Sequence, residues 1–187
     1  MHRAILAILL LLTFAGSVHA QDCTVIIHGM GRTSASMNKV ENELAKAGYI
    51  TWNKTYRTNS KPIEQLAYEH VESGVNYCQL QQAKTIHFLT HSLGGILVRI
   101  YLQNNEIQNL GKIVMLSPPN KGSEVADYLQ DWKIYQWLTG AAGQALGAAP
   151  NSYVNSLKPI DAQIGIITGD RSSDPWFSPL IPGADDG

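Results

Sequence analysis

The stretch that decides the fold reads Thr90-His91-Ser92-Leu93-Gly94-Gly95, and the strand-like run Ile86-His87-Phe88-Leu89 directly precedes it. After it, apolar residues recur at helical spacing from residue 96 to residue 101. Small residues around Ser92 allow a sharp turn between a strand and a helix, and such a turn holds the serine hydroxyl out toward an open site. The pattern therefore predicts Ser92 as a nucleophile.

Thr90 departs from the usual form of this turn, in which a glycine stands two residues before the nucleophile. Threonine is larger than glycine, but it fits extended backbone well. We therefore expect Thr90 to alter the local packing more than the chemistry.

A second glycine-rich turn, His28-Gly29-Met30-Gly31-Arg32, follows the first predicted strand. Acyl transfer places negative charge on a carbonyl oxygen, and each preorganised N–H donor for that charge contributes roughly 3 kcal/mol. We expect the backbone N–H groups of Leu93 and Met30 to be the two donors of such an oxyanion hole. Alternatively, residues 28–32 form a plain tight turn that supplies no donor.

Strand-like and helix-like segments alternate after residue 20. Their spacing predicts strands over 24–27, 49–52, 85–90, 112–116 and 163–168, and helices over 34–47, from Ser60 and Pro62 onward, and from 93 to about 103. This alternation predicts an α/β fold with a mostly parallel central sheet and helices on both faces.

Residues 121–158 differ in composition, because they combine aromatic residues with Gly/Ala-rich sequence. The segment from Trp132 to Leu138 either borders a substrate site or forms an ordinary crossover helix. The sequence alone leaves both interpretations open.

The composition is that of one globular domain. The chain has 187 residues, of which 44% are hydrophobic and 16% charged. The formal net charge of −1 gives no electrostatic reason to expect nucleic acid, an anionic membrane or a highly charged substrate as a partner.

The first 20 residues have the pattern of a secretory signal peptide. Arg3 supplies the positive start, an apolar run from 4 to 14 follows, and Val18-His19-Ala20 offers a small-residue cleavage site. The apolar run is much shorter than the ~20 residues that span a bilayer. We expect cleavage after Ala20, export without a stable membrane anchor, and a single domain over 21–187.

Cys23 and Cys78 are the two cysteines of the chain, and both lie after the predicted cleavage site. Exported proteins meet an oxidising compartment, which favours a Cys23–Cys78 disulfide over two buried free thiols. The sequence contains no Cys/His cluster of the kind that binds zinc, so no metal site is predicted.

Three stretches together resemble a known family: Val25 to Gly31, His87 to Gly95, and Val114 to Ser123. The chain resembles the secreted bacterial serine lipases and esterases of the compact α/β-hydrolase type over nearly all of residues 21–187. The resemblance implies hydrolysis of lipid or other carboxyl esters through an acyl-enzyme on Ser92, without a cofactor. The Asn120 and Gly122 of the third stretch are expected to shape a loop.

The same resemblance suggests the acid of a catalytic triad. The order in this superfamily is serine, then acid, then histidine. Asp186 precedes Gly187 as the acid precedes a glycine in family lipases, so it is the expected acid, with Asp185 and Asp170 as alternatives. Because the sequence stops within this motif, we expect the C-terminal part of the domain to be missing by a few tens of residues.

The histidine base is the part that the sequence does not supply, since no histidine follows the expected acid. His91 adjoins Ser92, but its side chain should point away from the serine. His87 is expected in the core, His70 on the surface of a helix, and His28 as a support of the oxyanion turn. Family members carry the base in a later loop.

These features favour a serine hydrolase of acylglycerols or related carboxyl esters. Two alternatives stay open. One is a non-catalytic protein of the same fold that binds lipid or a partner, and the other is a thioesterase or acyltransferase that uses the same serine.

Overall fold

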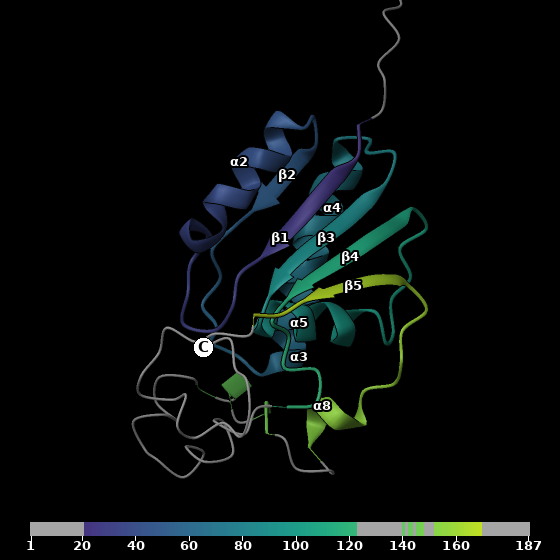
Figure 1. Cartoon of the computed structure of the whole chain (residues 1–187). Helices are drawn as coiled ribbons and strands as arrows, with labels where there is room; N and C mark the ends of the chain where they lie inside the picture. Colours follow the sequence, from purple (N-terminus) through teal and green to yellow (C-terminus); the bar gives the residue numbers. More distant parts are fainter. Residues whose placement is uncertain (1–20, 123–139, 141, 144, 148–151, 170–187) are drawn as a thin grey trace, which may run out of the picture.

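The computed structural model describes residues 21–122, 140, 142–143, 145–147 and 152–169. Its centre is a five-stranded sheet in the order β2-β1-β3-β4-β5, in which every neighbouring pair is parallel (Figure 1). The strands are β1 (Cys23–Ile27), β2 (Ile50–Asn53), β3 (Ile86–His91), β4 (Leu110–Leu116) and β5 (Gln163–Ile167). The predicted parallel α/β sheet is confirmed.

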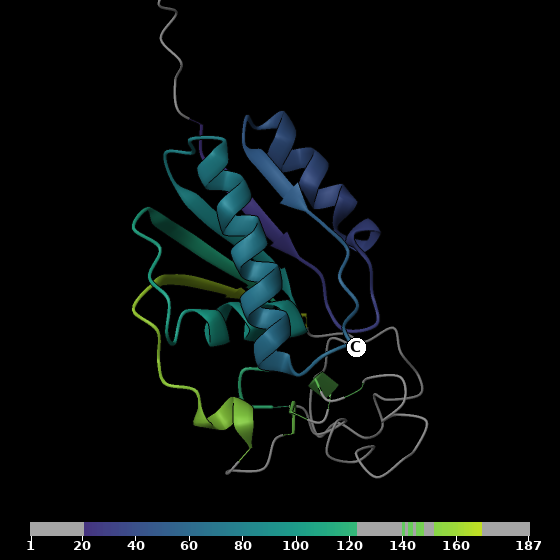
Figure 2. The same cartoon turned by 180° about the vertical axis from the view of Figure 1, so that it is seen from behind.

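Helices lie on both faces of the sheet, as right-handed crossovers between parallel strands require. The 3-10 turn η1 (Ser34–Met37) leads into α2 (Asn38–Lys46), which packs over β2 on one face (Figure 1). The opposite face carries α5 (Leu93–Tyr101) and one long helix (Figure 2). That helix consists of α3 (Ile63–Leu66), the π-helical turn η2 (Ala67–Val71) and α4 (Glu72–Leu80), and a short helix α8 (Tyr153–Ser156) precedes β5.

The core forms between the sheet and the long helix. Val25 and Ile27 are fully buried because β1 has a strand on each side. A Cβ atom built on Gly74 of α4 would lie 2.5 Å from Val25 Cγ1, so the helix approaches β1 as closely as a glycine allows. By contrast, β5 is an outer strand of the sheet among the described residues, and Ile167 on it is 59% exposed.

The predicted disulfide between Cys23 and Cys78 is confirmed. It joins the start of β1 to α4, and both cysteines are fully buried. The two residues are 55 positions apart, and closing a loop of that length stabilises the fold by about 4 kcal/mol in the chain-entropy treatment.

The strand and helix limits differ from the predicted ones by one to two residues at several places. The largest shift in a strand is in β4, which begins at Leu110 and so includes Gly111. A side chain at Gly111 would meet the His87 ring, since a Cβ atom there would lie 2.4 Å from His87 Nδ1. The predicted signal peptide over 1–20 and the segment from Trp132 to Leu138 lie outside the described residues.

No helix in the described ranges is both long enough and apolar enough to cross a bilayer.

Candidate active site

Ser92 lies between β3 and α5, at the carboxyl edge of the sheet, where parallel α/β folds bind their ligands. Its backbone has φ 48° and ψ −119°, a conformation that residues other than glycine rarely adopt. The Ser92 N–H donates to Leu116 O at 2.9 Å, and its carbonyl accepts from the Gly95 N–H at 3.0 Å. The strand and helix predicted on either side of this serine therefore hold it in a strained turn.

The residues around Ser92 are small because α5 packs closely on β1. A Cβ atom on Gly94 would lie 2.6 Å from the carbonyl oxygen of Ile27. Thr90 is fully buried, and its hydroxyl lies 3.4 Å from the carbonyl oxygen of Val114, to which it donates. The threonine thus fits the extended strand, as expected, with its polar atom bonded to the next strand.

The turn over 28–31 lies directly beside Ser92. Strands β1 and β3 are paired so that Ile27 faces Thr90, which brings both following turns to the same edge. A Cβ atom on Gly29 would lie 3.2 Å from Ser92 Cβ and 2.6 Å from His91 Nδ1. The structure thus brings together the turn and the serine that the sequence singled out.

The two expected oxyanion donors flank this junction. Met30 is half-buried, with its side chain against the core, and Leu93 is fully buried at the start of α5. Among the described residues, neither backbone N–H takes part in the hydrogen bonds of the turns and loops.

His28 supports the turn, in agreement with the sequence-based expectation. Its ring is fully buried and stacks on Tyr56 with 4.3 Å between the ring centroids. The Tyr56 N–H donates to His28 Nε2 at 3.3 Å, and His28 Nδ1 lies 2.9 Å from Gly29 O. Since Nε2 must accept, the neutral ring carries its proton on Nδ1 and donates to Gly29. Burial lowers the pKa of His28, and nearby His91 lowers it further.

The expected surface position of His70 is wrong. Its ring packs between Trp52 and Tyr56, with centroid distances of 4.8 and 4.3 Å, and its Nε2 is buried. Burial lowers the pKa of His70 to about 4. His70 stands seven residues after Ile63 and three after Ala67, on the apolar stripe of the helix, so the helical spacing contained the signal.

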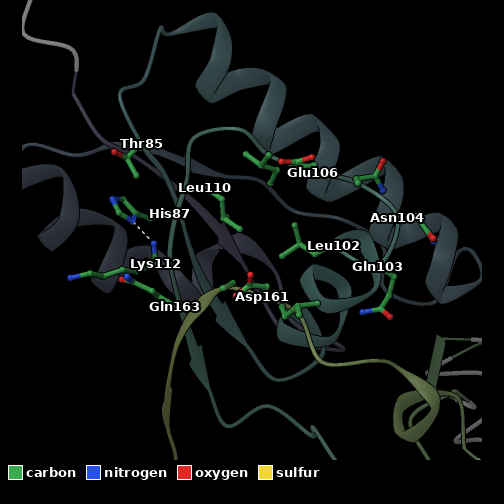
Figure 3. A pocket seen from close by; sticks show the side chains of 15 residues that line it. Thr85, His87, Leu102, Gln103, Asn104, Glu106, Leu110, Lys112, Asp161 and Gln163 are labelled. Carbon is green, nitrogen blue, oxygen red and sulfur yellow. Dashed lines mark hydrogen bonds between the residues drawn. The ribbon is translucent and has the colours of Figure 1, made fainter.

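His87 lies away from Ser92, near the start of β3. Its Nδ1 accepts from the Lys112 N–H at 2.9 Å, and its Nε2 lies 3.6 Å from Asp22 Oδ2. It lines an open cavity of about 1060 Å³ together with residues such as Thr85 and Gln163 (Figure 3). That cavity is at the amino ends of the strands, opposite the edge where ligands of parallel sheets bind, so it is not the candidate site.

The acid is not placed by the structure, because Asp186, Asp185 and Asp170 lie outside the described residues. Nor do three His, Cys, Asp or Glu side chains gather into a metal-binding group anywhere in the described ranges.

The sequence analysis missed two residues that contact the oxyanion turn, Tyr56 and Thr58. The Gly31 N–H donates to Thr58 Oγ1 at 3.2 Å, and the Tyr56 hydroxyl donates to His28 O at 2.8 Å. These contacts span 27 and 28 residues, so no local motif marks them.

A third missed contact involves Arg99 of α5. Its Nη1 donates to both the carbonyl and the side-chain oxygen of Asn120 at 3.1 Å. These two hydrogen bonds tie α5 to the loop after β4 that contains Asn120.

Comparison with known proteins identifies the family. The family model of palmitoyl protein thioesterases matches residues 23–157, a range that contains both turns. The chain belongs to the palmitoyl protein thioesterase family. Family and fold together indicate a hydrolase of the lipase, esterase and thioesterase type.

Solved structures share the fold of this family member at low sequence identity. The mature form of the Bacillus licheniformis lipase BlEst2 is 15% identical, with a TM-score of 0.64 over 83% of this chain and 69% of that one. The phospholipase PlaB from Legionella pneumophila is 17% identical, with a TM-score of 0.65 over 87% of this chain and 41% of that one. An esterase from Pyrococcus furiosus is 17% identical, with a TM-score of 0.56 over 79% and 61% of the two chains.

These likenesses confirm the expected α/β-hydrolase fold. No curated protein sequence matches the chain. The chain spans 37% of the propeptide form of BlEst2 and 41% of PlaB.

Proposed function

We propose that the protein is a serine hydrolase that cleaves carboxyl esters of lipid-like acyl groups through an acyl-enzyme on Ser92. The observation that carries this proposal is the position of the strained Ser92 turn directly against the Gly29 backbone. A strained serine turn beside a second turn that can supply an N–H donor is the arrangement that α/β-hydrolases use for acyl transfer.

In the proposed reaction, Ser92 Oγ attacks the carbonyl carbon of the ester and its proton passes to a general base. The carbonyl oxygen takes up the electron pair, and the N–H groups of Met30 and Leu93 stabilise the negative charge. Collapse of this intermediate breaks the bond to the leaving alcohol, which takes the proton. Water then cleaves the acyl-enzyme by the same steps and releases the acid.

Asp186 remains our proposed acid partner. The order of the triad in this superfamily implies that the histidine base follows it. Its role would be to hold that histidine in one tautomer and to stabilise the imidazolium that forms.

We also propose that the protein is exported after removal of residues 1–20. The disulfide between Cys23 and Cys78 supports export, because such bonds persist in oxidising compartments.

Thioester hydrolysis is the second candidate, and the family match favours it. The chemistry at Ser92 is the same, except that a thiol leaves in place of an alcohol. Comparing kcat/KM for an oxygen ester and a thioester of the same acyl chain distinguishes the two substrate classes.

The test uses protein expressed from the whole natural reading frame, with chromogenic esters as substrates. We expect Ser92→Ala to lower kcat by at least about 10⁴-fold, since loss of a triad nucleophile removes most of the rate. Ser36→Ala is the matched control, because that hydroxyl is exposed and donates to the nearby Thr33 carbonyl at 2.8 Å. Equal turnover by Ser92→Ala and the unaltered enzyme would eliminate the proposal and favour a binding protein.

A further inference from the structure

We infer that the segment 55–58, between β2 and α3, positions the oxyanion turn of residues 28–31. This inference rests on the proposed function, since it concerns the N–H donor of Met30. The segment follows β2 at the carboxyl edge of the sheet, next to the turn after β1.

Tyr56 holds the first part of the turn through two hydrogen bonds to His28, one to its ring and one to its backbone. Its N–H donates to His28 Nε2 at 3.3 Å, while its hydroxyl donates to the His28 carbonyl at 2.8 Å. Stacking of the two rings, with centroids 4.3 Å apart, adds to these bonds. Both the ring and the backbone of His28 are therefore fixed by one residue.

Two threonines hold the other side of the turn. Thr58 Oγ1 accepts from the Gly31 N–H at 3.2 Å, and Thr58 is only 6% exposed, so water competes little for this bond. Thr55 Oγ1 accepts from the Ser34 N–H at 3.0 Å and lies 2.9 Å from Ser34 Oγ. The chain is thus tied before and after Met30.

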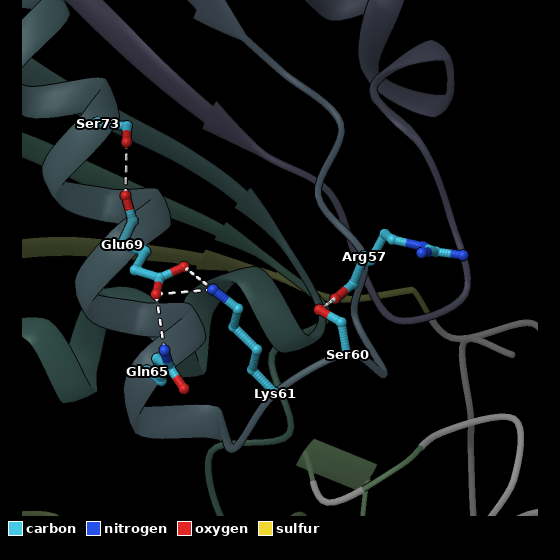
Figure 4. Close-up of polar contacts among 6 residues, drawn as sticks. All are labelled: Arg57, Ser60, Lys61, Gln65, Glu69 and Ser73. Carbon is cyan, nitrogen blue, oxygen red and sulfur yellow. Dashed lines mark hydrogen bonds and ion pairs between the residues drawn. The ribbon is translucent and has the colours of Figure 1, made fainter.

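The segment is itself anchored to the long helix. The Ser60 hydroxyl donates to Arg57 O at 2.8 Å and closes the turn over residues 57–60 that contains Thr58, and Lys61 pairs with Glu69 of η2 at 2.6 Å (Figure 4). The Tyr56 ring also packs on His70 of the same helical turn. Movement of the segment would disturb all of these contacts together.

The consequence for catalysis follows from the place of Met30. Met30 stands between Gly29 and Gly31, and glycines by themselves permit many backbone conformations. An oxyanion donor is effective only when its direction is fixed before the reaction. Tyr56 and Thr58 are accordingly positioning residues rather than catalytic ones.

The test compares Tyr56→Phe and Thr58→Val with the matched controls Tyr68→Phe and Thr51→Val. Tyr68 is 51% exposed, and Thr51 Oγ1 lies 3.3 Å from Glu41 Oε1, away from the turn. We expect each test variant to lower kcat about tenfold with KM within about twofold, because a displaced oxyanion donor affects the transition state more than substrate binding. The controls should keep the kcat of the unaltered enzyme and melt at similar temperatures to the test variants.

Hydrogen exchange of residues 28–34, measured without substrate, provides a readout that is independent of turnover. We expect about tenfold faster exchange in both test variants and no change in the controls. Unchanged exchange in Tyr56→Phe and Thr58→Val overturns the inference whatever the enzyme does. Unchanged kcat in both, with a Ser92→Ala variant that is inactive, also overturns it, whereas an active Ser92→Ala variant overturns the proposed function instead.

Discussion

The Ser92 turn and the oxyanion turn meet at one edge of the sheet, but different interactions hold them. The Ser92 turn is held by the strand and helix that adjoin it in the sequence, and by backbone bonds to Leu116 and Gly95. The oxyanion turn depends on side chains of Tyr56 and Thr58, more than 25 residues away. The Ser92 turn thus belongs to a strand-turn-helix unit that is continuous in the sequence and is held by backbone bonds, whereas the oxyanion turn is held by side chains from a separate segment.

This difference has a measurable consequence. Damage to the Ser92 turn should reduce the stability of the whole sheet, because α5 and β1 pack against it. Damage to the contacts of the oxyanion turn should reduce the rate while the protein stays folded.

Removing the disulfide should have the largest effect and should weaken both turns together. The double variant Cys23→Ala, Cys78→Ala should lose about 4 kcal/mol of unfolding free energy, because the unfolded chain is then no longer cross-linked. Urea denaturation followed by circular dichroism measures the change. A loss confined to one of the two turns, seen by hydrogen exchange, would argue against their sharing one cooperative fold.

Acid should destabilise the fold through the buried histidines next to the oxyanion turn. Burial lowers the pKa of His70 to about 4, below the ordinary 6.5 that the unfolded chain retains. The unfolded chain therefore binds protons first, and the His70 contribution, up to about 3 kcal/mol, is present above pH 6.5 and lost as the pH falls toward 4. His28, whose pKa burial also lowers, acts in the same direction.

Denaturation at a series of pH values, with His70→Phe as the comparison, measures this effect. Phenylalanine keeps an aromatic ring between Trp52 and Tyr56 but cannot bind a proton. We expect a shallower loss of stability between pH 6.5 and 4 in this variant. An unchanged pH dependence would contradict the assignment to His70.

Two glycine variants separate the turns directly. In Gly94→Ala, the new methyl group would lie 2.6 Å from the Ile27 backbone oxygen, which cannot move freely, so we expect a loss of about 1–3 kcal/mol in stability. In Gly29→Ala, the methyl group would press on the His91 ring and Ser92 Cβ, and we expect kcat to fall by about 100-fold with a smaller loss of stability. Thermal denaturation and ester turnover measure the two effects, and the reverse pattern would contradict the comparison.

Thr90→Ala should have the smallest effect. Its hydroxyl makes one long hydrogen bond, of 3.4 Å, to Val114 O, so we expect a loss of about 1 kcal/mol and a kcat within about twofold of the unaltered enzyme. A large drop in kcat without a change in melting temperature would show that Thr90 takes part in the chemistry.

The success of the sequence analysis follows the same division. The parallel sheet, the disulfide and the strand-turn-helix around Ser92 could be predicted because each depends on local patterns or on a single pair of cysteines. The surface position predicted for His70 is wrong because its spacing from Ile63 places this polar residue on the apolar stripe of the helix. Tyr56 and Thr58 could not be predicted, since their roles depend on how β1 and β2 lie side by side.

The most decisive measurement on the enzyme is covalent labelling with a fluorophosphonate, followed by mass analysis of tryptic peptides. Cleavage after Lys84 and Arg99 gives a peptide in which Ser92 is the one serine. An activated Ser92 predicts a single adduct on this peptide, at a rate that parallels the loss of ester turnover, and no adduct in Ser92→Ala. Complete loss of turnover with the label on another peptide, or a label that persists in Ser92→Ala, would contradict the assignment of Ser92 as the nucleophile.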